Sequence, residues 1–281
     1  MKTGKKCDII VYNDINKRTE TMSEKIIIRG VGVDNVTLND AAEICKGFIN
    51  AADGLPKAVF TPNSEIIQAC VEDNSLYSVI NSADLVTPDG IGVIYASKIL
   101  GRPLKAKCAG YELGLEMVKY SNDSGAKIFF LGGKPGVAEA ARDKLLEAYP
   151  DAKFVGTRDG YFKKEGEESD RVVDEINASG ADILYVCLGV PVQEKWILAN
   201  REKLTSVKLC LALGGSLDGY SGNVKRAPRI FINLGLEWFY RLICQPSRIG
   251  RMMKLPKFLF GVIFSKLIGK HKNDIIIGGA K

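Results

Sequence analysis

The sequence is poor in the residues on which many enzyme sites depend. Its one histidine, His271, lies near the C-terminal end, which excludes a histidine general base or a histidine-rich metal site in the preceding part of the chain. No Asp-x-Asp pair occurs, although many nucleotide-sugar enzymes use such a pair to hold a divalent cation over a diphosphate. The sequence therefore predicts metal-independent chemistry without a cofactor, and the expected base is a carboxylate.

The cysteines form neither a disulfide framework nor a zinc motif. They are seven, an odd number, and they are widely spaced without a CxxC pair. Most lie within apolar runs, where they are typical of small buried hydrophobic residues. We therefore expect a reducing compartment and no structural zinc.

Long apolar stretches are also lacking. The segment Met1–Lys25 is polar and charged almost throughout, unlike a secretory signal peptide. The apolar run Phe258–Phe264 has only seven residues, far short of the ~20 that a membrane-spanning helix needs. We expect a cytoplasmic protein whose basic, amphipathic C-terminal segment lies peripherally on the inner face of the plasma membrane.

Positive charge is concentrated at one end of the chain. The net charge is +6, but residues 225–272 contain eleven Lys and Arg against one acid, which gives this block +10 and leaves residues 1–224 at −4. Such a block usually contacts polyanions, meaning nucleic acid, anionic lipid or phosphate groups. Because its basic residues are interleaved with Phe258, Phe260 and Phe264, an anionic membrane surface fits better than a nucleic acid, and no nucleic-acid partner is expected.

Short apolar runs alternate with amphipathic segments between residues 25 and 215. The runs are KIIIRG, AVFTPN, DLVTPDG, KIFFLGG, ILYVCLG and LCLALGG. This alternation predicts an α/β fold, with a mostly parallel sheet covered by helices on both faces. We expect a polar N-terminal extension over residues 1–24, an α/β body over 25–222 and a basic appendage over 223–281.

Polar residues and glycines follow several of these runs, at the strand ends where an open parallel sheet binds ligands. Asp89 has this position in Thr-Pro-Asp-Gly, although Pro-Asp-Gly is also a common turn. Asn63 is as well suited to cap the next helix as to contact a substrate. Gly132 and Gly133 precede a helix whose free N–H groups could receive phosphate, but their loop matches neither GxGxxG nor a Walker A motif.

Taken together, the motifs resemble those of the WecG/TagA/CpsF glycosyltransferase family. The resemblance runs from about Val59 to about Met253 and rests on TPN, LVTPDGIGV, LGGKPGVAEAA, YPDAKFVG with GYF, LGVPVQEKW, LGGSLDGYSG, KRAP and LEWFYRL with QPSRIGR. It implies a Rossmann-like body with a basic helical appendage that docks on the membrane. It also implies inverting, metal-independent transfer of an N-acetylmannosamine-type sugar from a UDP donor to undecaprenyl-diphosphate-linked N-acetylglucosamine, in teichoic acid linkage-unit synthesis.

The resemblance also implies roles for individual residues. Asp89 matches the proposed general base, and Thr61, in the neighbouring polar loop, is expected to be the second catalytic residue. The residues expected at the substrate are Asn63, Lys107, Gly132, Gly133, Gln193, Asp218, Arg241, Arg248 and Arg251, with the three arginines at the diphosphate groups. Lys107 and Glu112 stand where members usually have arginine and aspartate, and an ammonium group cannot make the bidentate phosphate contact of a guanidinium.

Two other functions stay open from the sequence. A transferase of the same family could use another donor, such as UDP-N-acetylmannosaminuronic acid, in capsule or exopolysaccharide synthesis. A non-catalytic nucleotide-binding protein anchored to the membrane is the second alternative, and in it Pro-Asp-Gly would be only a turn. The oligomeric state is also open, a homo-oligomer included.

Overall fold

The computed structural model describes residues 23–51, 54–224, 227–228, 230–231, 236–244, 250 and 254–268. Within these residues, one sheet has six strands in the order β4-β3-β8-β7-β5-β6, and every neighbouring pair is parallel. The strands are β3 (Lys57–Phe60), β4 (Leu85–Val86), β5 (Lys127–Gly132), β6 (Lys153–Arg158), β7 (Ile183–Cys187) and β8 (Leu209–Ala212). The predicted α/β fold with a mostly parallel sheet is confirmed.

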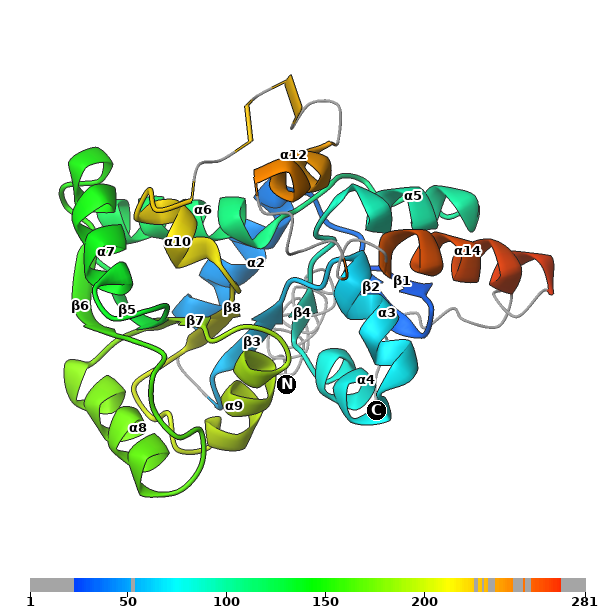
Figure 1. Ribbon diagram of the computed structural model, residues 1–281. Helices are drawn as coiled ribbons and strands as arrows, with labels where there is room; N and C mark the ends of the chain where they lie inside the picture. Colours follow the sequence, from blue (N-terminus) through cyan, green and yellow to red (C-terminus); the bar gives the residue numbers. More distant parts are fainter. Residues whose placement is uncertain are drawn as a thin grey trace, which may run out of the picture.

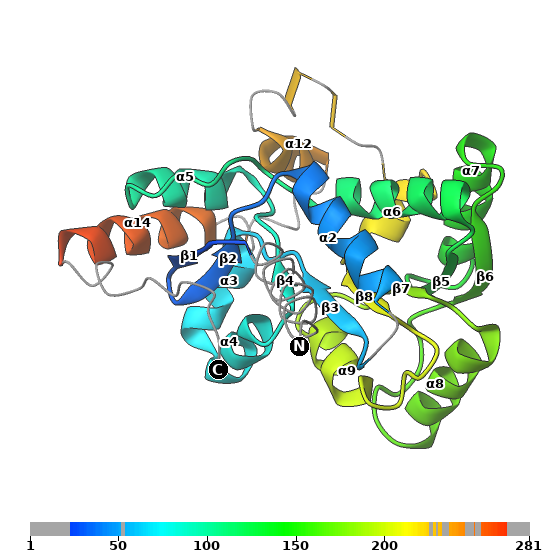
Figure 2. The ribbon, with the colours of Figure 1, turned by 180° about the vertical axis from the view of Figure 1, so that it is seen from behind.

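Helices cover both faces of this sheet, as the sequence predicted. Successive side chains of β5 point to opposite faces: Phe129 and Leu131 lie in one buried cluster, Ile128 and Phe130 in the other. The first cluster is covered by α3 (Ser64–Glu72), α4 (Asn74–Asn81), α5 (Ile91–Ile99), α8 (Glu167–Ser179) and α9 (Val192–Asn200). The second is covered by α2 (Leu38–Asn50), α6 (Gly110–Ser124), α7 (Val137–Ala148) and α10 (Ser216–Tyr220). Figure 1 has α8 and α9 in front, and the view from behind in Figure 2 brings α2 to the front.

Two strands differ from the sequence prediction. The run KIIIRG forms β1 (Lys25–Ile28), which is outside the parallel sheet and pairs antiparallel with β2 (Val31–Asp34) in a two-stranded hairpin. The sixth parallel strand is instead β6, which was not among the predicted runs. It lies at the sheet edge and is only partly buried, so it lacks a continuous apolar pattern.

The C-terminal part contributes α12 (Glu237–Cys244) and α14 (Lys254–Leu267). One face of α14 belongs to the body, because Phe258 and Val262 are fully buried in the same cluster as Phe129. Polar contacts reinforce this packing: Lys257 forms an ion pair of 2.7 Å with Glu72 of α3, and Arg29 in the β1–β2 turn donates to the Gly261 carbonyl at 3.2 Å. The helix therefore lies against the hairpin, α3 and α5 (Figure 1).

The opposite face of α14 is apolar and exposed. Phe260, Phe264 and Leu267 are 72%, 62% and 78% exposed, and their spacing puts them away from Phe258 and Val262. Among the described residues, no helix has the length and apolar composition to span a membrane.

Candidate active site

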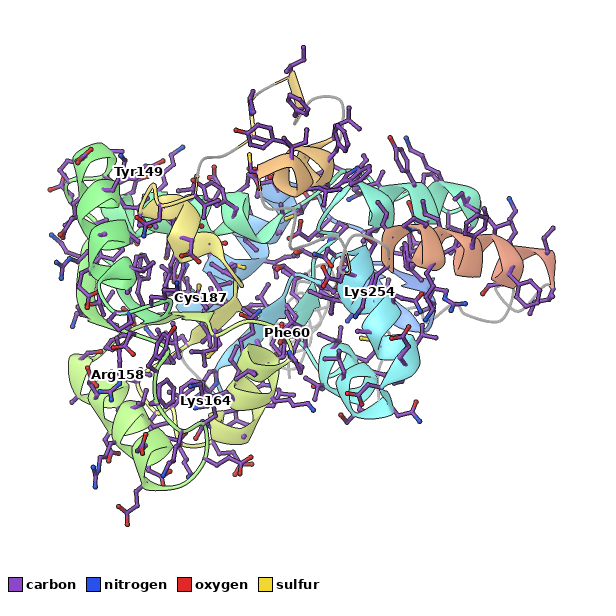
Figure 3. All side chains as sticks on the ribbon, viewed as in Figure 1. Phe60, Tyr149, Arg158, Lys164, Cys187 and Lys254 are labelled. Atoms are coloured by element: carbon purple, nitrogen blue, oxygen red, sulfur yellow. The ribbon has the colours of Figure 1, made fainter. Side chains whose placement is uncertain are left out.

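The loops that follow the parallel strands meet at one edge of the sheet, because all six strands run in the same direction. Figure 3 labels the last residues of three of them, Phe60 of β3, Arg158 of β6 and Cys187 of β7. The polar residues predicted from the sequence lie in these loops or in the helix turns directly after them. They are Thr61 and Asn63 after β3, Asp89 after β4, Gly132 and Gly133 at the end of β5, Gln193 after β7 and Asp218 after β8.

The Asp89 carboxylate lies at the N-terminus of α6. Its Oδ2 accepts from the Gly110 backbone N–H at 3.5 Å, and the Cys108 N–H donates to the Pro88 carbonyl at 2.9 Å, so two contacts join the loop of Asp89 to the start of the helix. A helix N-terminus carries a partial positive charge, so the charges of the carboxylate and the helix end are complementary. Burial first, and then the charge of Asp89, raises the pKa of the neighbouring Cys108 thiol to about 12, so this thiol is no nucleophile at neutral pH.

Thr61 lies against the same helix start. Its Oγ1 donates to the Ala212 carbonyl at 3.2 Å. A Cβ at Gly110 would come within 2.7 Å of that oxygen, so only glycine allows α6 to begin here. Gly110 therefore lies between Thr61 and Asp89, so the two predicted catalytic residues lie at the same helix start.

Asn63 is the N-cap of α3. Its side-chain oxygen accepts from the Ile66 N–H at 3.0 Å, which confirms the capping interpretation of the sequence. The residue also borders the loop of Asp89, because a Cβ at Gly90 would lie 3.7 Å from its Cβ. A substrate contact through its amide nitrogen stays a prediction.

Gln193 is only 2% exposed and connects two of the loops. Its Oε1 accepts from the Gly189 N–H after β7 at 3.2 Å and from the Gly214 N–H after β8 at 3.1 Å. Its amide nitrogen donates to Glu194 at 2.8 Å. The side chain is thus a brace that holds the carboxyl ends of neighbouring strands together, a role that its place in the sequence could not indicate. A direct contact with the donor stays a prediction.

Glu194 was not predicted from the sequence. It is 2% exposed, and burial raises its pKa to about 7, against the lowering effect of the Gln193 hydrogen bond. The sequence around Glu194 does not separate polar from apolar residues on opposite faces of a helix. The burial of this side chain could therefore not be predicted.

Gly132 and Gly133 have backbone conformations with φ of +130° and +76°. A Cβ at Gly132 would lie 2.2 Å from the Cys187 carbonyl oxygen, so glycine is required for the close approach of β5 to β7. The Gly133 N–H donates to the same carbonyl at 3.2 Å. These contacts explain both glycines structurally, and phosphate binding by their loop stays a prediction.

Asp218 lies in α10 and is partly buried at the end of β8. Lys107 forms an ion pair of 3.4 Å with Glu237, the first residue of α12. This pair connects the loop before α6 with the C-terminal part, across 130 positions of the sequence.

Two of the predicted substrate arginines, Arg248 and Arg251, lie outside the described residues. Arg241 is in α12, one helical turn after Glu237, but its side chain also lies outside the description. Across the part of the chain that the structure describes, no three His, Cys, Asp or Glu side chains form a group that could hold a metal ion.

At its carboxyl edge the parallel sheet carries a carboxylate that lies against a helix N-terminus. This arrangement places the chain among the α/β enzymes that bind ligands at this edge. The chain belongs to the glycosyl transferase WecG/TagA/CpsF family, whose model matches residues 26–272. The resemblance of the motifs is thereby confirmed.

Curated relatives cover most of the chain. One from Bacillus spizizenii is 38% identical over 205 residues, which are 73% of this chain and 78% of the relative. One from Staphylococcus aureus strain MRSA252 is 34% identical over 252 residues, 90% of this chain and 96% of the relative. Both are named N-acetylglucosaminyldiphosphoundecaprenol N-acetyl-beta-D-mannosaminyltransferase.

Proposed function

We propose that the chain transfers an N-acetyl-β-D-mannosaminyl group from UDP to N-acetylglucosaminyldiphosphoundecaprenol, in the synthesis of the teichoic acid linkage unit. The names of the curated relatives support the acceptor and the sugar. The observation that carries the chemistry is the placement of Asp89 beside Thr61 at the N-terminus of α6.

In this reaction Asp89 is the general base. It takes the proton from the acceptor hydroxyl as that oxygen attacks the anomeric carbon, and the bond from this carbon to the UDP oxygen breaks on the opposite side. Thr61, at the same helix start, and Asn63, beside the loop of Asp89, position the sugars. The negative charge that develops on UDP is stabilised by N–H groups and by cations of the basic C-terminal segment, among them Arg241, Arg248 and Arg251.

The direct test is product formation. The protein is incubated with UDP-N-acetylmannosamine and a polyprenyl-diphosphate N-acetylglucosamine, and the lipid product is measured by mass spectrometry. We expect a gain of one N-acetylhexosamine. Parallel reactions with UDP-N-acetylmannosaminuronic acid and UDP-N-acetylglucosamine test the donor, and a faster reaction with either would overturn the choice of sugar.

Chelation of metal ions should leave the rate unchanged. In this reaction the arginines and N–H groups stabilise the leaving UDP, and residues 225–272 carry a net charge of +10. The initial rate is measured with and without EDTA after the protein has been dialysed against the chelator. A loss of activity that magnesium or manganese restores would contradict this assignment.

We also propose that the protein binds the inner face of the plasma membrane through the exposed side of α14. Phe260, Phe264 and Leu267 can enter the lipid interface while Phe258 and Val262 stay in the core. The basic residues of the same segment then contact anionic headgroups.

Replacing both outward phenylalanines, Phe260→Ser with Phe264→Ser, should abolish this binding without unfolding the body. Burying one phenylalanine contributes about 1.5–3 kcal/mol, so the double variant should bind phosphatidylglycerol vesicles at least ~10²-fold more weakly. Co-sedimentation measures the binding. The matched control is Leu55→Ser, which removes an apolar side chain of 48% exposure away from α14 and should bind as the wild type does. Equal binding of all three proteins would rule out this surface.

A further inference from the structure

Asp34 is a buried carboxylate outside the candidate site. It is the last residue of β2 and only 3% exposed. Its Oδ1 accepts from the Ser23 hydroxyl at 2.5 Å, and its Oδ2 accepts from the Val86 backbone N–H at 2.7 Å and lies 3.5 Å from the Lys25 ammonium. Burial raises the pKa of Asp34, whereas Lys25, Ser23 and the Val86 N–H lower it. A buried acid with three partners is expensive to desolvate, so its position calls for an explanation.

The contact with Val86 closes the edge of the parallel sheet. β4 is the edge strand and has only two residues, Leu85 and Val86. Its inner side is bonded to β3, since the Thr87 N–H donates to the Phe60 carbonyl at 2.9 Å. The N–H of Val86, one residue earlier, points to the other side of the strand, where the sheet has no further strand. Asp34 accepts this N–H in place of a neighbouring strand.

The short strand leads directly into the loop of Asp89. Val86 is three residues before Asp89, and between them the Pro88 carbonyl accepts from the Cys108 N–H at 2.9 Å. The loop is therefore held at three points: by β3 through Thr87, by the start of α6 through Pro88, and by the β1–β2 hairpin through Asp34. Without Asp34, the outer side of the strand would have a buried N–H without an acceptor.

We propose that Asp34 is a positioning residue for sugar transfer, which fixes the strand end at Val86 so that the Asp89 carboxylate meets the acceptor hydroxyl; this role rests on the function proposed above. Asp34 does not touch the substrate. It acts through the backbone, and it makes the β1–β2 hairpin, which lies outside the parallel sheet, a functional part of the site.

The test compares Asp34→Ala with two matched variants. Ser23→Ala removes another hydrogen bond of the Asp34 carboxylate but leaves the Val86 contact intact. Asp84→Ala removes a carboxylate that accepts a strand N–H in the same way, from Ala58 at 2.8 Å, but at the amino end of the sheet and with Arg201 as a partner at 2.7 Å. Asp84→Ala thus reports on a loss of stability at the amino end of β4, with the Val86 contact left in place.

For Asp34→Ala we expect kcat to fall at least ~10-fold, with the KM of the donor within ~3-fold of the wild type, since a displaced base affects the chemical step more than donor binding. Asp34→Asn keeps an acceptor for the Val86 N–H and should recover most of kcat. Ser23→Ala and Asp84→Ala should keep kcat within ~3-fold when assayed well below their melting temperatures. Hydrogen–deuterium exchange should become faster over residues 85–90 in Asp34→Ala alone.

Unchanged exchange over residues 85–90 in Asp34→Ala would overturn the proposal, and so would equal losses of kcat in Asp34→Ala and Asp84→Ala. The exchange measurement separates this proposal from the proposed function. If the wild-type protein forms no product, the proposed function fails, and the exchange of residues 85–90 still decides whether Asp34 anchors the loop. If Asp34→Ala is too unstable to assay, Asp34→Asn takes its place. A kcat of Asp34→Asn as low as that of Asp89→Asn, together with wild-type exchange over residues 85–90, would contradict the positioning role of Asp34.

Discussion

Asp89→Asn should lower kcat for sugar transfer at least ~10²-fold, because an amide cannot accept the proton of the acceptor hydroxyl. This substitution removes the negative charge of the side chain and keeps its size. The asparagine side chain has the same shape as aspartate, and its oxygen can still accept from the Gly110 N–H. We therefore expect UDP to bind with an affinity within a few-fold of the wild type.

The measurement combines product chromatography for kcat with calorimetry for UDP affinity. Asp123→Asn is the control, because Asp123 is an exposed aspartate near the C-terminal end of α6, at the opposite end of that helix from the site. It should behave as the wild type does in both assays. Activity of Asp89→Asn within a few-fold of the wild type would mean that the base is another residue.

Arg241→Ala should have the second-largest effect, a loss of roughly 10- to 10²-fold in kcat, since a charge-assisted hydrogen bond to a diphosphate contributes about 1.5–3 kcal/mol. The loss is expected even with a short, water-soluble acceptor analogue. This result would show that the basic segment takes part in the reaction, beyond attaching the body to the membrane.

Lys266→Ala is the matched control for Arg241→Ala. It removes one positive charge from the same basic segment, in the last turn of α14. If the segment acts only through its total charge at the membrane, both variants should keep full activity on the soluble analogue. That outcome would leave stabilisation of UDP to the α/β body.

Point variants test the basic segment better than truncation does. A deletion from residue 223 onward removes Phe258 and Val262, which are fully buried in the core of the body. It also removes Lys257 and Glu237, which form ion pairs with Glu72 and Lys107. A truncated chain could therefore lose activity through unfolding, whatever the arginines do.

The fold was predictable where burial leaves a continuous apolar run. Strands β3, β5, β7 and β8 are buried almost completely, and each was found from its sequence. The run of β1 was found but placed in the wrong sheet, since three isoleucines in a row do not distinguish a parallel strand from a hairpin strand. β6 was missed because an edge strand with partly exposed residues has no such run.

The candidate site was predictable in part for a similar reason. Thr61 and Asp89 follow strands of a parallel sheet, and such strands end at one edge, so their proximity follows from the topology. The brace made by Gln193 and the ion pair of Lys107 with Glu237 depend on contacts between distant segments, which local patterns do not encode. Asp34 likewise lies 52 positions from Val86, the residue that it holds.

The anomeric configuration of the product tests the central claim, direct displacement at the anomeric carbon, most directly. A transfer in one step inverts the anomeric carbon, so a donor with the α configuration must give a β-linked mannosaminyl product. The product is purified, and the one-bond coupling between C1 and H1 of its mannosaminyl residue is measured by nuclear magnetic resonance. We predict the β linkage; an α-linked product would require a covalent intermediate or another route and would contradict the account.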